Sequence, residues 1–381
     1  MVLSVSLPYA MNDAPTSYSA EPEDDTELDV MQSSRSMLKV LKQTSLSLVK
    51  AAGGFTLTHR SGWRRKRLLI LGYHGVSIDD EHRWNPSLFM HSDYFAARLQ
   101  LIKNLGCTVL PLGVALRRMY AGDLPHRSVA LTFDDGGYEF YRVAYPLIKE
   151  FDLPVTLYLT TYYSHYNRPV FHVMCPYLLW KGRQRVLALA NLTGGDETFT
   201  LSNERARAAA LRALLIFARA HDLTAEEKDD LNERLARQLH VDYERLLEQR
   251  ILHLVSPAEA RQLAAEGVDV QLHTHRHRTP AERSRFVREI EDNRRSIREI
   301  TGSDSSLTHF CYPNGFHGPA FFPWLKEMGI ESAATCDAAL ASRSSNPLLL
   351  PRLVDSSLLS PVEFESWVTG VADFLPQRAR A

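Results

Sequence analysis

The sequence contains few cysteines and no long apolar run. Cys107, Cys175, Cys311 and Cys336 are scattered along 381 residues without a CxxC pair, a spacing that predicts reduced thiols rather than a disulfide framework. No stretch approaches the ~18 to 20 uninterrupted apolar residues that a membrane-spanning helix needs. The N-terminus lacks the positive start and the unbroken apolar run of a secretory signal. We therefore expect a cytoplasmic protein.

The chain also lacks an excess of charge of either sign. It has 44 Lys and Arg against 45 Asp and Glu, a formal net charge of −1, so the total charge does not favour binding to nucleic acid. Apolar residues make up 45% and charged residues 23%, the balance of an ordinary soluble globular protein. A chain of this length can hold one large α/β domain or two smaller ones. The oligomeric state is left open.

Two segments precede the first predicted strand. Residues 1–34 are rich in Ser, Pro, Asp and Glu, and we expect them to be disordered because they offer too little apolar surface to offset chain entropy. Residues 35–66 combine a helical apolar stripe with the basic run RSGWRRKR, which extends to Arg67. This pattern predicts a helix that packs on its own domain or, alternatively, a peripheral membrane contact through residues 36–67.

From residue 67 to about residue 370, predicted strands and helices alternate. The strands are RLLILGYHGV, SVALTF, PVTLYLTT, VDVQLHTH, LTHFCYP and ESAATC. Such alternation predicts a parallel sheet or barrel with helices outside it. It breaks at about residues 164–250, where long helical tracts occur without a good strand. We interpret this segment as a helical insertion that covers the cleft of one α/β domain.

Polar residues follow three of the predicted strands. They are Asp134-Asp135, the run from His273 to His277, and Tyr312-Pro313-Asn314-Gly315. Because ligands of α/β folds bind at the carboxyl ends of the strands, we expect these residues to face one site. A simple cap formed by the Asp-Asp-Gly-Gly turn is the alternative for the first of them.

Two histidines and one carboxylate are the usual composition of a hydrolytic zinc centre. His273 and His277 could supply the imidazoles, and the Asp pair could supply one ligand and one general base for the bound water. Pairing His273 with His275 is an alternative, because alternate residues of a strand point the same way. A barrel that binds glycan or metal without turnover is another, although it has no use for a carboxylate off the metal.

These motifs resemble those of the polysaccharide deacetylases, the NodB-homology group of carbohydrate esterase family four. LTFDDGG is similar to the family's TFDDG motif, HTHRH to its H-[ST]-x-x-H motif and CYPNG to its third motif, between about Leu68 and Asp355. The resemblance implies an α/β fold, a distorted (β/α)7 barrel, that removes N-acetyl or O-acetyl groups from an acetylated carbohydrate. A deformylase or deacetylase of a lipid-linked sugar at the cytoplasmic membrane face would use the same chemistry.

The resemblance also implies roles for particular residues. By motif position, Asp134 is the general base, and Asp135, His273 and His277 bind a divalent metal, usually zinc. The backbone N–H of Asn314 would polarise the acyl carbonyl. Thr274 would support the histidine geometry, and His275 falls on a variable position.

The third motif departs from the family pattern of Arg-x-Pro-Tyr, because Cys311 stands at the arginine position. Arg352, in LPRLVD, is our candidate to replace that arginine beside Asp134, against a plain salt-bridge role. The general acid is open between His74 in GYHG and His317 in NGFHG, with a loop histidine as the alternative for each.

Overall fold

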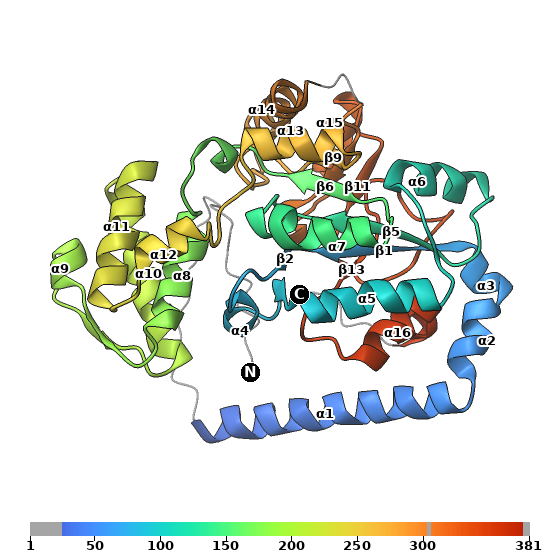
Figure 1. Ribbon diagram of the computed structural model, residues 1–381, viewed down its shortest axis with the longest axis horizontal. Coiled ribbons are helices and arrows are strands. Elements are labelled where there is room, and N and C mark those ends of the chain that lie inside the picture. Colours follow the sequence, from blue (N-terminus) through green and yellow to red (C-terminus); the bar gives the residue numbers. More distant parts are fainter. Residues whose placement is uncertain (1–24, 303–305, 376–381) are drawn as a thin grey trace.

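The structure is a computed structural model that describes residues 25–302 and 306–375, with only the backbone described for residues 25–36. Most of the segment expected to be disordered, residues 1–24, lies outside the described residues. A sheet of parallel strands forms the centre of the molecule (Figure 1). In spatial order its parallel strands are β11 (Ser332–Ala334), β10 (His309–Cys311), β9 (Asp269–Leu272), β6 (Thr156–Leu159), β5 (Ser128–Phe133), β1 (Arg67–Tyr73) and β13 (Leu353–Val354). Two further strands flank it: β4 (Thr108–Val109) beside β5 and the antiparallel β12 (Ala341–Ser342) beside β1.

The neighbouring strands β1 and β5 are mostly apolar because both of their faces are covered. Every residue of β5 is buried, as are all residues of β1 after Arg67. Their parallel register pairs Leu69 with Val129 and ends with Tyr73 opposite Phe133. The residues that follow these two strands therefore leave the sheet side by side.

A late segment of the chain closes the sheet. Leu350 forms a parallel bridge with Ala334 of β11, and β13, a few residues later, pairs with β1 at the other end of the sheet. Both ends thus contact residues 350–354, and the sheet curls into a distorted barrel. The predicted (β/α)7 barrel is confirmed.

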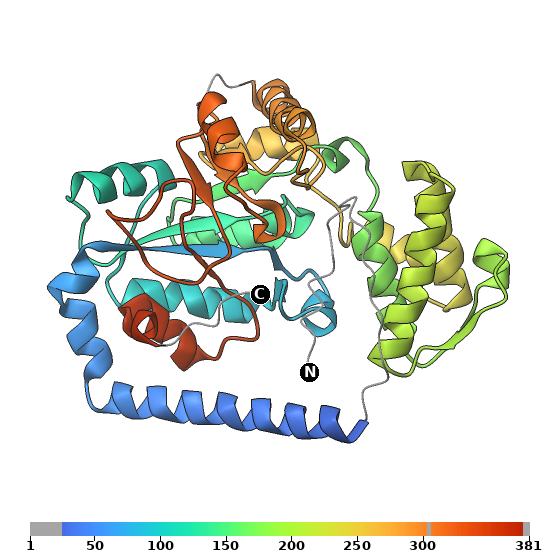
Figure 2. The ribbon, with the colours of Figure 1, turned by 180° about the vertical axis from the view of Figure 1, so that it is seen from behind.

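Helices surround this barrel (Figures 1 and 2). They are α5 (Ser92–Asn104), α6 (Leu112–Ala121), α7 (Tyr145–Glu150), α13 (Pro257–Ala265), α14 (Arg283–Thr301), α15 (Phe321–Glu327) and α16 (Pro361–Thr369). Ser256 caps α13 as its sequence predicts, since the Ser256 hydroxyl accepts from the backbone N–H of Glu259 and Pro257 occupies the first helical position. Near the start of the barrel lie α4 (Glu81–Trp84) and the paired short strands β2 (Gly75–Val76) and β3 (Phe89–Met90).

The helical insertion lies beside the barrel and has an apolar core of its own. It comprises α8 (Phe171–Lys181), α9 (Ala190–Thr193), α10 (Glu204–Ala220), α11 (Ala225–Gln238) and α12 (Tyr243–Glu248). In Figure 1 the arrowhead of β6 points toward it, so the insertion lies on the side of the strands' carboxyl ends. The expectation that it holds no strand was wrong: β7 (Val186–Ala188) and β8 (Thr198–Thr200) form a hairpin. Three residues are too few to show a strand's period of two.

Three helices lead into β1: α1 (Asp25–Ala51), α2 (Gly54–Arg60) and α3 (Gly62–Arg65). The first begins at Asp25, earlier than the start predicted at residue 35, so the prediction of disorder was wrong for residues 25–34. Low apolar content does not by itself prevent a helix from continuing. In both views α1 is a long rod along the edge of the molecule, near α16 (Figures 1 and 2). Among the described residues, no helix is long and apolar enough to cross a membrane.

Candidate active site

The register of β1 and β5 places His74 and Asp134 next to each other at the carboxyl end of the barrel. The backbone N–H of Asp134 donates to the carbonyl of Tyr73 at 2.9 Å, which extends the pairing by one step. Asp134 is buried, with 2% of its surface exposed. A carboxylate in such a position needs a charged or hydrogen-bonding partner.

Arg352 is that partner. Its Nη1 donates to Asp134 Oδ1 at 2.8 Å and its Nη2 donates to Oδ2, a two-pronged contact between fully buried groups. The guanidinium is itself fixed, because its Nε donates to the carbonyl of Thr335 at 2.7 Å. Burial alone would raise the pKa of Asp134, but the charge and hydrogen bonds of Arg352 outweigh it and lower the pKa. Asp134 is therefore ionised at neutral pH.

Asp135 faces a different set of groups. Its Oδ1 lies 3.2 Å from Nε2 of His273 and 3.1 Å from Nε2 of His277. The ligand atoms of all three residues lie within 4.8 Å of one another. One carboxylate and two imidazoles that meet in this way fit a divalent metal with positions left for water and substrate.

The orientation of His273 suits a metal ligand. Its Nδ1 lies 2.8 Å from the carbonyl oxygen of Cys311, so this nitrogen carries the proton and donates it. Nε2, on the side of Asp135, then has a free lone pair. Burial lowers the pKa of His273, but the hydrogen bond to Asp135 and the charges of both aspartates outweigh it and raise the pKa.

A second group of potential ligands, Asp134, His273 and Cys311, also lies within 4.8 Å. It fits a metal poorly, because Arg352 already occupies both oxygens of Asp134. Burial also raises the pKa of the Cys311 thiol well above its usual value, and a protonated thiol is not a metal ligand.

His275 points elsewhere. Its Nδ1 lies 2.8 Å from the Thr161 hydroxyl, and it is not part of either group of potential ligands. The alternative pairing of His273 with His275 is therefore not the arrangement in the structure. Thr274 is buried, and its hydroxyl accepts from the backbone N–H of Arg278 at 3.0 Å, which closes the loop that carries His277.

The two candidate general acids lie in different surroundings. His74 Nε2 is 3.8 Å from Asp134 Oδ2, whereas His317 Nε2 is 3.4 Å from Asp337 Oδ2. Burial lowers the pKa of His74. Of the two histidines, His74 is the one beside the buried carboxylate.

Asn314 is exposed at the tip of a short turn, in the left-handed region with φ of 57°. The next residue, Gly315, packs against Cys336: a Cβ at position 315 would lie 3.0 Å from that of Cys336. Cys336 Sγ is in turn 3.8 Å from Nη2 of Arg352. The turn of the third motif is thus connected by contact to the groups around Asp134.

Several site residues have a strained backbone. Asp135, Thr274 and His277 have φ of 70°, 63° and 54°, a region that non-glycine residues seldom adopt and that is least favourable for a β-branched residue such as Thr274. Such conformations cost free energy and persist when the surrounding structure enforces them. Their concentration here indicates that the ligand geometry is imposed by the fold.

Asn293 of α14 is a site-positioning residue that the motifs do not reveal. It is fully buried, and its Oδ1 accepts from the backbone N–H of His273 at 3.0 Å. Its Nδ2 donates to the carbonyl of Leu159 at 3.0 Å and to the Thr161 hydroxyl at 2.9 Å. The sequence did contain a signal, since Asn293 stands on the apolar face of the predicted helix between Ile290 and Ile297.

Glu289, one turn earlier on α14, holds the rest of the histidine loop. Its carboxylate accepts from the backbone N–H of Arg276 at 2.8 Å and from Nε of Arg278 at 2.8 Å. Its carbonyl accepts from the backbone N–H of His275 at 3.0 Å. One helix therefore fixes both ends of the segment from His273 to His277.

The end of the insertion is joined to the aspartate loop. The backbone N–H of Val255 donates to the carbonyl of Gly136 at 2.9 Å, and that of Tyr138 donates to the carbonyl of His253 at 2.8 Å. A Cβ at Gly136, where φ is 84°, would lie 2.3 Å from Leu159 Cδ1. Glycine is therefore required where the insertion meets the loop of Asp135.

A buried carboxylate lies beneath this loop. Glu139 has 6% of its surface exposed, and burial, followed by repulsion from Glu81 and Asp135, raises its pKa to about 8. Its Oε1 would be 2.9 Å from a Cβ placed at Gly75, so it fills the space between β2 and the aspartate loop.

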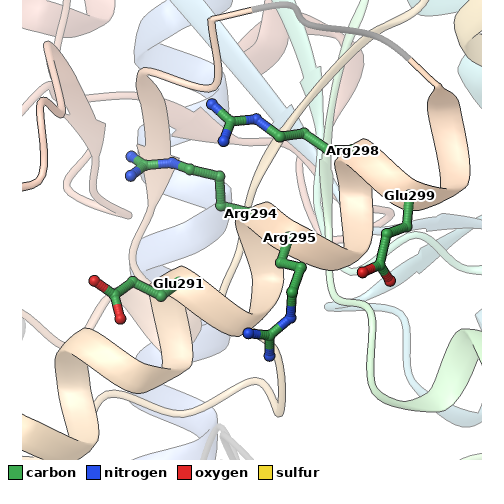
Figure 3. A pocket seen from close by; sticks show the side chains of 5 residues that line it. All are labelled: Glu291, Arg294, Arg295, Arg298 and Glu299. Atoms are coloured by element: carbon green, nitrogen blue, oxygen red, sulfur yellow. The ribbon is translucent and has the colours of Figure 1, made fainter.

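A hollow on the outside of α14 is a separate feature (Figure 3). It is lined by Glu291, Arg294, Arg295, Arg298 and Glu299, all from this one helix. Arg294 already donates to the carbonyl of Met328 at 2.9 Å, and Arg295 pairs with Asp292. None of the predicted site residues lines this hollow.

A family model described as polysaccharide deacetylase matches residues 121–192 and 221–333, which include both aspartates and both histidines of the cluster. The chain belongs to the polysaccharide deacetylase family. It is thus a hydrolase that acts on carbon–nitrogen bonds other than peptide bonds, and its substrate class is an acetylated carbohydrate. The family also uses a divalent metal, for which Asp135, His273 and His277 are the candidate ligands.

Several solved structures are similar to this one at low sequence identity. The Streptococcus pyogenes deacetylase PplD in complex with acetate is 18% identical, with 77% of this chain and 95% of that chain covered and a TM-score of 0.49. IcaB from Ammonifex degensii is 17% identical, with 80% and 97% covered and a TM-score of 0.48. A de-N-acetylase from Aggregatibacter actinomycetemcomitans is 13% identical, with 79% and 99% covered and a TM-score of 0.47. A search of curated proteins found no match to this deacetylase.

Proposed function

We propose that this deacetylase hydrolyses the N-acetyl group of an amino sugar within a carbohydrate and releases acetate. The observation that carries the proposal is the separation of two adjacent carboxylates. Asp135 meets His273 and His277, while both carboxylate oxygens of Asp134 are bound by Arg352. A metal ligand and a base are thus available side by side, as the hydrolysis of an amide requires.

Asp135, His273 and His277 would hold the metal. Two imidazole nitrogens and one carboxylate oxygen suit zinc well among divalent ions. When bound, the ion supplies a Lewis acid that polarises the acyl carbonyl and makes a water molecule easier to deprotonate.

Asp134 acts as the general base. Its carboxylate is ionised because Arg352 lowers its pKa, and the two-pronged contact fixes its orientation. It removes a proton from the water whose oxygen attacks the acyl carbon. The backbone N–H of Asn314 would donate to the acyl oxygen as negative charge develops there.

His74 delivers the proton to the leaving nitrogen. Its Nε2 lies 3.8 Å from Asp134 Oδ2, so a proton taken up by the carboxylate has a short path to the imidazole. The carbon–nitrogen bond then breaks, and the products are acetate and a free amine. His317 is assigned no part, because its ring lies with Asp337.

The decisive test compares the natural protein with Asp134→Asn. We expect the variant to keep its bound metal and to lose acetate release from N-acetylated amino sugars by at least about a hundredfold, because it lacks the base. Asp337→Asn, which changes a carboxylate beside His317, is the matched control and should keep its activity.

The natural protein should also be tested with O-acetylated, N-formylated and lipid-linked sugars as substrates. Turnover of one of these in place of N-acetyl sugars would correct the substrate and retain the chemistry. Metal binding without hydrolysis of any of them would instead indicate a glycan-binding barrel, and absence of metal binding would refute the proposal.

A further inference from the structure

Helix α1 presents its apolar side to solvent, the reverse of an ordinary surface helix. Its exposed apolar side chains, with exposed fractions between 41% and 69%, are Met37, Leu38, Val40, Leu41, Leu48 and Val49. Residues spaced three and four apart along a helix share one face. Met37, Leu41 and Leu48 therefore share the outer side of α1, in an apolar stripe that is interrupted by Thr44.

Polar contacts fix this orientation. Gln43 Nε2 donates to a Glu363 oxygen of α16 at 3.1 Å, and Lys42 pairs with the same carboxylate at 3.2 Å. Lys50 pairs with Glu365 of α16 at 2.6 Å. Leu46 alone among the apolar residues from Met37 to Val49 is buried on this inner side. The outward direction of the apolar stripe is thus set by the protein and not by a free rotation of the helix.

The same part of the chain is strongly basic. Residues 37–67 contain no Asp or Glu, but they contain Lys39, Lys42, Lys50, Arg60, Arg64, Arg65, Lys66 and Arg67, in a chain whose formal net charge is −1. Two of these lysines pair with α16 and Arg64 is buried. Lys39, Arg60, Arg65 and Lys66 are exposed. This region therefore combines apolar side chains with excess positive charge at the surface.

We propose that α1, together with the basic residues of α2 and α3, lies flat on an anionic lipid surface. An interfacial helix buries its apolar face at the boundary of headgroups and acyl chains, and nearby cations add attraction to anionic lipids. The part of α1 that carries the stripe, residues 37–49, extends over ~20 Å at 1.5 Å per residue, long enough to lie along the surface. Pairing with a second copy is disfavoured, because it would bring two segments of the same positive charge together.

Flotation of the full-length protein with lipid vesicles tests the proposal. We expect it to float with vesicles of equal parts phosphatidylcholine and phosphatidylglycerol, and to float less with phosphatidylcholine alone or at high salt. Replacing two stripe residues, Leu41→Gln with Leu48→Gln, should reduce partitioning by at least about tenfold, because it removes buried apolar area. Both side chains are exposed, so the fold and the hydrolysis of a soluble substrate should be unchanged.

Ile216→Gln is the matched control. Ile216 is also an exposed apolar residue of a helix, with 61% of its surface exposed, but it lies in the insertion. It should not alter flotation. The lipid proposal is overturned if the natural protein does not float with anionic vesicles, or if the stripe variant floats equally well. It is also overturned if light scattering shows that the natural protein and the Ile216→Gln control are dimers and the stripe variant is a monomer, since a second copy then covers this face.

Discussion

Asp134 and Asp135 are adjacent in the chain but do different work because their backbones differ. Asp134 continues the pairing of β5 with β1, while Asp135 has a φ of 70° that turns its carboxylate toward the histidines. Arg352 then binds the carboxylate of Asp134, and the two imidazoles contact that of Asp135. The two identical side chains thus differ chemically because the backbone directs them to different partners.

The histidine pair provides the first prediction at this scale. His277→Ala should weaken zinc binding by at least about a hundredfold, because it removes one of three ligands. His275→Ala should leave binding unchanged, because His275 contacts Thr161 instead. Metal content after dialysis against a competing chelator measures both. If His275→Ala loses the metal and His277→Ala keeps it, the ligand set is wrong.

Arg352→Met should destabilise the protein by roughly 3–5 kcal/mol, because Asp134 is left as a buried charge without its partner. Urea unfolding of metal-free protein measures this loss. The double variant Arg352→Met with Asp134→Asn should recover most of the stability but no activity, because it removes the charge and the base together. A single variant as stable as the natural protein would show that Asp134 is not ionised in the fold.

The sequence predicted the contact of Arg352 with Asp134 but not that of Asn293 with His273. Arg352 could be proposed only because the third motif lacked its arginine, since a separation of 218 residues carries no local signal. Asn293 was missed because it belongs to no motif. Its place on the apolar face of the predicted helix was a signal of a buried polar residue, but its partner, the backbone N–H of His273, became known only from the position of α14 in the structure.

At the scale of elements, α14 determines the shape of the site. Asn293→Leu should weaken metal binding by about tenfold and lower the free energy of unfolding by roughly 1–3 kcal/mol, because the backbone N–H of His273 loses its acceptor inside the protein. Asn104→Leu, on the exposed face of α5, is the control. Titration with zinc and thermal unfolding measure the two effects. Unchanged metal affinity would mean that Asn293 serves stability alone.

Elements with strong local signals were predictable and short ones were not. The helix that starts at Ser256 and Pro257 has a cap, a proline and an apolar stripe, and it occurs where expected. The two-residue strands β4, β12 and β13 have no periodicity to detect. They are strands only because they pair with β1 or β5, so they can be identified only in the assembled sheet.

At the scale of the whole molecule, Glu139 should make stability depend on pH. Its pKa of about 8 in the fold lies above its usual value of about 4.5, so the fold favours the protonated form. The stabilisation is complete below about pH 4.5 and is lost as the pH rises toward 8, at up to roughly 1.4 kcal/mol per pH unit.

Glu139→Gln should remove this pH dependence. With both proteins metal-free, the Gln variant should have a higher free energy of unfolding than the natural protein at pH 8.5. This difference should disappear toward pH 4.5. Chemical unfolding across this range measures it. If the difference in the free energy of unfolding between the two proteins stays constant with pH, the prediction is wrong and Glu139 titrates normally.

The arrangement of the insertion could not be obtained from the sequence. Its helices were predictable from their periodicity, but their position beside the strand ends depends on contacts such as that between Val255 and Gly136. Its role as a cover for the cleft stays a prediction. The alternation of strands and helices predicted a parallel sheet or barrel with helices outside it, and the resemblance to the deacetylase family specified the distorted (β/α)7 barrel.

The closure of the barrel by residues 350–354 has a consequence for synthesis. A ribosome makes the metal ligands and the base long before it makes Arg352, which belongs to this last segment of the barrel. Until then the carboxyl end of β1 lacks its neighbour β13, and the carboxylate of Asp134 has no counter-charge to be buried with. A chain that ends before residue 352 therefore cannot complete its catalytic centre, even though it already contains the base and all three candidate metal ligands.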